Sequence, residues 1–200
     1  MRTAVALLFV AAAAVAAPVP KTIKAKLKDY YPMADGATWE YSMGGTDVTV
    51  RVKDVAEKDG ARSAKLVTEH GGKAVASETI RVDKDGVFRT HINDTEIKPP
   101  VPLLKFGLTD DESWEVKAAV QSSEVKGTFT LKGTEKVTVP SGEHDAVLVV
   151  GECTIAGTQT GTKWWIADGV GIVKLEYSIG GTASTPLELK KYTTGKAEKK

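Results

Sequence analysis

The sequence predicts an all-β protein, an antiparallel meander of about 10–12 strands that curls into a half-barrel or barrel-like sheet. Apolar and polar residues alternate with period two from about residue 37 onward, and no helical period persists beyond one turn. Glycine-containing turns such as Asp59-Gly60, Asp85-Gly86 and Gly180-Gly181 separate the alternating segments. A sheet with so many strands does not stay flat, and a β-sandwich is the alternative because it produces the same alternation.

The alternation is clearest in five segments, residues 39–43, 48–53, 114–121, 125–132 and 173–179. In each of them one face of the strand is apolar and the other is polar. This pattern is typical of antiparallel strands that pack one face on a core and expose the other to water.

The chain contains signs of an internal duplication. Residues 35–41 (DGATWEY) find an echo in residues 110–116 (DDESWEV), and each half later reaches an Asp-Gly-Val turn, at residues 85–87 and 168–170. Either half alone would form a marginal sheet with one apolar face, so we expect the two halves to share one core.

These landmarks predict the domain boundaries. A single all-β domain covers residues 36–193, with halves 36–98 and 103–193. The proline-rich run Lys98-Pro-Pro-Val-Pro102 joins them as an extended crossover, because proline is not expected inside a central strand. Residues 18–35 form an N-terminal extended segment, and residues 194–200 form a disordered basic tail.

Residues 1–17 have the features of a cleavable signal peptide. Arg2 precedes an unbroken apolar run, Ala4 to Val15, which ends in a small-x-small cleavage site. The run is shorter than the roughly 20 residues that span a bilayer. No cysteine follows the cleavage site, as it would in a bacterial lipoprotein. We therefore expect a secreted or periplasmic protein with no integral membrane segment in the mature chain.

Composition limits the classes of partner. The 27 basic residues balance the 26 acidic ones, so the chain has no strong attraction to nucleic acid. Cys153 is the only cysteine, so no intramolecular disulfide can form. It shares the parity of Val147, Val149 and Ile155, which places its thiol on the apolar face of a strand.

No catalytic or metal-binding constellation is visible, so we expect no enzyme activity, no metal and no cofactor. His70, His91 and His144 lack metal-ligand spacing. Ser141, His144 and Asp145 are residue types of a hydrolase triad, but they lie together in one predicted hairpin turn, without a nucleophile elbow.

The aromatic residues are the candidate ligand-binding residues. Trp164 and Trp165 are consecutive on a predicted strand, so their side chains must lie on opposite faces of the sheet. One belongs to the core, and the other lies under a loop or is exposed to a ligand or partner. Tyr177 and Trp39, both on apolar strand faces, complete this set.

Three segments resemble those of a group of uncharacterised exported bacterial proteins. Residues 29–41 (DYYPMADGATWEY) are similar to their YYPL-x-x-G-x-x-W-x-Y opening, and residues 139–146 (VPSGEHDA) are similar to their V-P-A-G-x-F-x-A turn. Residues 164–174 (WWIADGVGIVK) resemble their W-x-A-x-G-V-G-x-V-K segment. The resemblance implies a secreted or periplasmic β protein without an assigned activity.

These proteins are similar in pattern to the periplasmic lipoprotein-carrier half-barrels, whose concave face holds acyl chains. This chain differs from the carriers because it has no segment of helical period to plug the concave face. We therefore expect a non-enzymatic protein that binds a hydrophobic small molecule or an envelope protein on a curved sheet. The alternatives are a structural or interaction module with no small-molecule site and, with less support, a hydrolase.

Overall fold

The computed structural model describes residues 30–195, which form thirteen strands in one sheet and contain no helix. The predicted signal peptide and the end of the basic tail lie outside the described residues. Within the described range, no helix is long and apolar enough to cross a membrane. The strands are β1 (Thr38–Met43), β2 (Thr46–Lys58), β3 (Ala61–His70), β4 (Lys73–Asp83), β5 (Gly86–Ile92), β6 (Thr95–Lys105), β7 (Ser113–Val120), β8 (Ser123–Val139), β9 (Gly142–Ile155), β10 (Thr158–Ala167), β11 (Gly171–Ile179), β12 (Thr182–Ala183) and β13 (Leu187–Thr193).

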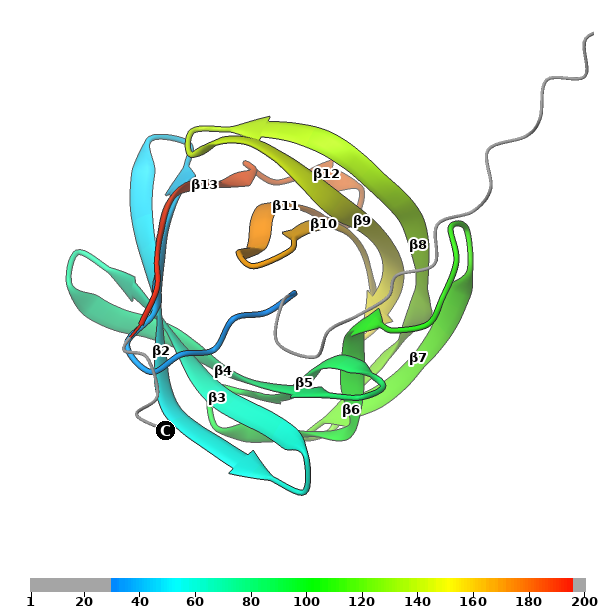
Figure 1. Cartoon of the computed structure of the whole chain (residues 1–200). Coiled ribbons are helices and arrows are strands. Elements are labelled where there is room, and N and C mark those ends of the chain that lie inside the picture. The colour runs from blue at the N-terminus through cyan, green and yellow to red at the C-terminus, as the bar shows by residue number, and fades with distance from the viewer. Residues whose placement is uncertain (1–29, 196–200) are drawn as a thin grey trace, which may run out of the picture.

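The sheet closes into a barrel (Figure 1). Strands β1 to β11 pair with their neighbours in chain order, all antiparallel, and β13 pairs with both β1 and β11 to complete the ring. The short strand β12 only extends β11 and stands outside the ring. The all-β meander and the curled sheet are therefore confirmed. The ring is fully closed, so it is neither a half-barrel nor the alternative β-sandwich.

The two ends of the barrel differ. We call the end that carries the turns at residues 44–45, 93–94, 156–157 and 180–181 the open end, and the opposite one the closed end. The segment Tyr30–Ala37 enters the interior at the closed end, as the blue chain in Figure 1 shows. Tyr31, Met33 and Ala37 are buried there, and the Tyr31 ring lies 5.9 Å from that of Trp39. The described part of the predicted N-terminal segment thus lies inside the barrel at this end.

The proline run is a strand segment and not a crossover. Residues 98–102 lie within β6, with a cis peptide bond between Lys98 and Pro99. β6 pairs with β7 only through Ile97 and Lys98, so the ladder on that side has already ended where the prolines stand. The indole Nε1 of Trp114 on β7 donates to the Pro102 carbonyl oxygen at 3.1 Å. Because the ladder has ended, no N–H is required of the prolines on this side, which is why they are tolerated, and the Trp114 indole satisfies the Pro102 carbonyl.

Two side-chain hydrogen bonds tie β1 to β11 and its preceding turn across the ring. Trp39 Nε1 donates to the Val170 carbonyl oxygen at 2.6 Å, and the Tyr41 hydroxyl donates to the Ile172 carbonyl oxygen at 2.8 Å. Burial raises the pKa of Tyr41, so the hydroxyl keeps its proton and remains a donor. These bonds support the ring where β13 meets β11 through only Lys174 and Leu175.

We expect Tyr41→Phe to lower the free energy of unfolding by about 1–3 kcal/mol, because it removes the partly buried hydrogen bond to the Ile172 carbonyl oxygen. Urea denaturation followed by circular dichroism measures the change. Tyr177→Phe is the control, since Tyr177 is 41% exposed at the open end, and it should change stability by less than about 0.5 kcal/mol. Equal effects of the two substitutions would contradict the role of the Tyr41 bond.

Candidate functional site

The interior holds an apolar cavity of about 280 Å³ near the open end. We call it the open-end cavity. Strands β5 to β11 supply its walls, and alternation places one side chain in every two along each strand inside the barrel. Its lining is mainly apolar, comprising Ile92, Ile97, Val101, Leu103, Val120, Val125, Phe129, Cys153, Ile155, Trp164, Tyr177 and Ile179, with Arg89, Thr160, Gly161, Thr162 and Ser178.

Other hollows of the molecule are larger but differ in character. One of about 440 Å³ lies beside Lys163 and Glu176, and another of about 470 Å³ lies beside Lys53, Lys65 and Asp94. Charged side chains from the outer faces of the strands line both. Ligand sites are usually concave, mainly apolar and equipped with few polar groups, so the open-end cavity is the best candidate.

Two inward-facing glycines in the cavity wall leave space for neighbouring side chains. Gly151 pairs with Phe129 across β8 and β9, and the Phe129 ring occupies the place that a Gly151 side chain would take. A Cβ on Gly127 would lie 2.5 Å from the Cys153 sulfur. The Phe129 ring is then held against Trp164, with ring centres 5.0 Å apart. These contacts form a rigid aromatic wall on one side of the space.

An apolar rim surrounds the open end. Five of the six exposed large hydrophobic side chains of the described residues belong to it: Met43, Ile92, Ile155, Tyr177 and Ile179, with exposures from 36% to 54%. Four of these also line the open-end cavity. Isolated exposed apolar residues are ordinary, but a gathering at the mouth of an apolar cavity is typical of a site that another molecule covers.

One ion pair lies inside the barrel, below this rim. Arg89 Nε donates to Glu78 Oε2 at 2.5 Å, and the two side chains are 28% and 26% exposed. Burial disfavours the charged form of Arg89, but the attraction of Glu78, the hydrogen bond to it and the nearby Tyr31 together outweigh burial, so the pKa of Arg89 is raised. Arg89 is the only charged residue that lines the open-end cavity.

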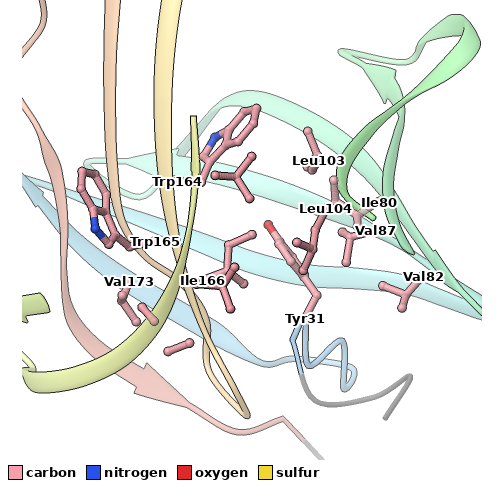
Figure 2. Close-up of a cluster of buried hydrophobic side chains, with 14 of the residues drawn as sticks. Tyr31, Ile80, Val82, Val87, Leu103, Leu104, Trp164, Trp165, Ile166 and Val173 are labelled. Carbon is pink, nitrogen blue, oxygen red and sulfur yellow. The ribbon is translucent and has the colours of Figure 1, made fainter. Parts of the chain in front are cut away.

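The structure separates the four aromatic residues that the sequence singled out. Trp164 and Tyr177 line the open-end cavity. Trp165 points away from Trp164, to the other face of the sheet (Figure 2). Its Nε1 donates to Glu135 Oε1 at 2.6 Å, and Lys174 Nζ lies 5.1 Å from its ring centre. Trp39 lies at the closed end, stacked on Tyr192. Only Trp164 and Tyr177 are therefore brought together.

Arg89, Glu78 and the rim isoleucines were not among the site residues predicted from the sequence. A signal for the ion pair was present, because Arg89 shares the parity of Val87, and Glu78 that of Ile80 and Val82, all three of which are buried. A charge at an inward position of a strand is a departure from the apolar-in pattern, and such departures are informative.

One side-chain contact in the structure is relevant to the hydrolase alternative. Ser141 Oγ lies 2.9 Å from His144 Nε2. Asp145 instead pairs with Lys136 at 3.5 Å, so it does not orient the histidine; Ser141 and Asp145 are exposed and His144 is half-buried. Across residues 30–195, no three histidine, cysteine or acidic side chains are grouped so that they could hold a metal ion.

Comparisons with known proteins establish the fold. No protein-family model and no curated protein matches the chain. Two solved structures do, each with a TM-score of 0.57 over 82% of this chain. One is a candidate lipoprotein from Parabacteroides distasonis, 12% identical, of which 98% is covered. The other is a candidate exported protein with a YmcC-like fold from Bacteroides fragilis, 15% identical, of which 99% is covered. The chain therefore shares the YmcC-like β-barrel fold.

We expect Gly151→Ala to destabilise the barrel by about 1–3 kcal/mol, because the added methyl group collides with the Phe129 ring. Thermal and urea denaturation measure the loss. The double variant Gly151→Ala, Phe129→Leu should lose less stability than the sum of the losses in the two single variants. The smaller leucine side chain leaves room for the added methyl group. Additive effects would show that the ring and the glycine are not coupled.

Proposed function

We propose that this protein is a non-enzymatic binding protein of the cell envelope that holds a small hydrophobic molecule in the open-end cavity. The observation that carries the proposal is the continuity between the cavity and the apolar rim, which share Ile92, Ile155, Tyr177 and Ile179. A protein that only needed a stable core would gain by covering these side chains, since exposed apolar surface costs roughly 25 cal/mol per Å². Residues 1–17 support export.

The size of the cavity favours a slender ligand. Its volume of about 280 Å³ is near the lower end of the roughly 300–1,000 Å³ of ligand pockets. A lipid with several chains would not fit, whereas one short acyl chain or a molecule of similar width would. The tail of such a ligand can also contact the apolar rim, which extends the apolar surface beyond the cavity.

A second candidate is an interaction module in which an envelope protein covers the apolar rim. The exposure of Ile179, at 54%, and of Ile155, at 42%, is the observation that favours it. This candidate needs no access to the interior. Binding that reaches Cys153 or Trp164 inside the barrel therefore distinguishes the two functions.

The first experiment is native mass spectrometry of the mature protein purified from its own envelope fraction, with lipid extraction in parallel. We expect a bound apolar species of low mass. In a second step the delipidated protein is titrated with the uncharged fluorescent probe N-phenyl-1-naphthylamine. Thr160→Phe, which places a ring inside the barrel beside Cys153, should weaken probe binding about tenfold or more.

Gln159→Phe is the matched control, because residue 159 precedes Thr160 on β10 and faces the outside. It should leave probe binding within about twofold of the wild type, since its side chain does not enter the cavity. Failure of the wild type to bind the probe, together with a ligand-free native mass, would contradict the proposal and favour the interaction module.

Cys153 gives an independent measure of occupancy, as the single cysteine of the chain and part of the cavity lining. Burial raises the pKa of its thiol, so less of the reactive thiolate is present at a given pH than for a free cysteine. We expect slow reaction with a maleimide, faster at higher pH, and slower still when the probe is bound. Unchanged reactivity at saturating probe would place the probe outside the cavity.

A further inference from the structure

The charged side chain of Arg89 limits the chemical class of ligand that the open-end cavity would bind. Arg89 lies on β5, three residues from the rim residue Ile92 toward the closed end, and therefore deeper in the barrel. Every other residue that lines the cavity is uncharged. The cavity thus has one cationic group at its inner part and apolar side chains at its mouth.

The Arg89 guanidinium has N–H groups that form no hydrogen bond with another described residue. Arginine carries five N–H groups and no acceptor. Among the described residues, Glu78 is the only hydrogen-bond partner of the Arg89 side chain, and the bond uses Nε. The remaining N–H groups sit on the two Nη atoms. The Arg89 side chain is 28% exposed, and the residue lines the cavity from an inward position of β5.

The position of Glu78 allows an anion to enter despite its own charge. Glu78 is not among the residues that line the cavity, whereas Arg89 is. The cavity therefore borders on the guanidinium and not on the carboxylate. Coulomb energy falls with distance, so the attraction exceeds the repulsion, and a carboxylate can also bind the Nη groups in bidentate geometry.

Resting on the proposed function, we propose that the ligand is a monocarboxylate with one hydrocarbon chain, and that its carboxylate binds the Nη groups of Arg89 while its chain points to the apolar rim. Glu78 positions the guanidinium and weakens the attraction for the anion. Arg89 and Glu78 are thus the residues that set the ligand's polar group and its affinity.

The test compares three molecules of equal chain length, decanoic acid, decanol and methyl decanoate, by calorimetric titration of the delipidated mature protein. The neutral molecules are the more hydrophobic, so partition alone would favour them. We expect the acid to bind about tenfold more tightly than either, because only the acid gains a charge-assisted pair with Arg89.

Two substitutions at the pair separate a role in recognition from a role in stability. Arg89→Gln should abolish the preference for the acid while the alcohol still binds. Glu78→Gln should tighten binding of the acid several-fold and leave the alcohol within about twofold, since it removes a repulsive charge. A purely structural pair predicts instead that both substitutions weaken all three molecules alike. Arg89→Lys keeps the charge without the planar fork and should retain part of the preference.

The outcomes distinguish this inference from the proposed function. Equal affinities of the wild type for acid and alcohol would overturn the carboxylate assignment and leave the hydrophobic ligand in place. Absence of binding by all three molecules and by the uncharged probe would overturn both. If Arg89→Gln fails to fold, Glu78→Gln still tests the proposal. Weaker binding of the acid by Glu78→Gln than by the wild type would contradict the repulsion assigned to Glu78.

Discussion

Closure of the sheet is the constraint on which the rest of the structure depends. The C-terminal strand β13 pairs along β1 and meets β11 through Lys174 and Leu175, which turns a chain-order meander into a ring. About eight strands make a barrel whose interior side chains just fill it, and the diameter grows with strand number. A ring formed by β1 to β11 and β13 is therefore too wide for its own side chains. The segment Tyr30–Ala37 fills one end, and the open-end cavity remains at the other.

The charged pair Arg89–Glu78 is hard to explain by stability alone. Removing two charges from water costs free energy that the pair regains only in part, and apolar replacements of similar volume are often neutral or stabilising. Leucine-sized side chains at these two positions would continue the surrounding apolar surface of Ile80, Val101 and Leu103. The presence of two charges at these positions therefore adds to the case for recognition of a polar group inside the barrel.

The sequence predicted the strands well because alternation is a local property, readable from residues such as Val173, Leu175 and Tyr177. It could not choose between barrel and sandwich, since that depends on whether β13 reaches β1, a contact between distant parts of the chain. The same limit applies to the site. Trp164 and Trp165 were correctly assigned to opposite faces, but the inward one could be identified only from the register with Val149 and Leu175. Proline was not expected inside a central strand, but β6 accommodates its prolines because the hydrogen-bonded ladder with β7 ends before them.

The order of polarity along the barrel axis bears on how a ligand would lie. An amphiphile that keeps its polar group in water would need an apolar interior and a polar mouth. Here the cationic Arg89 lies inside, and Ile155, Tyr177 and Ile179 surround the mouth. The exposed rim and the buried charge, each unfavourable in the empty protein, are both satisfied by one molecule with its anionic end inward and its chain outward. A ligand in the reverse orientation would leave the guanidinium facing hydrocarbon and would place a polar group against isoleucine, so the two unfavourable features together favour the inward orientation of the carboxylate.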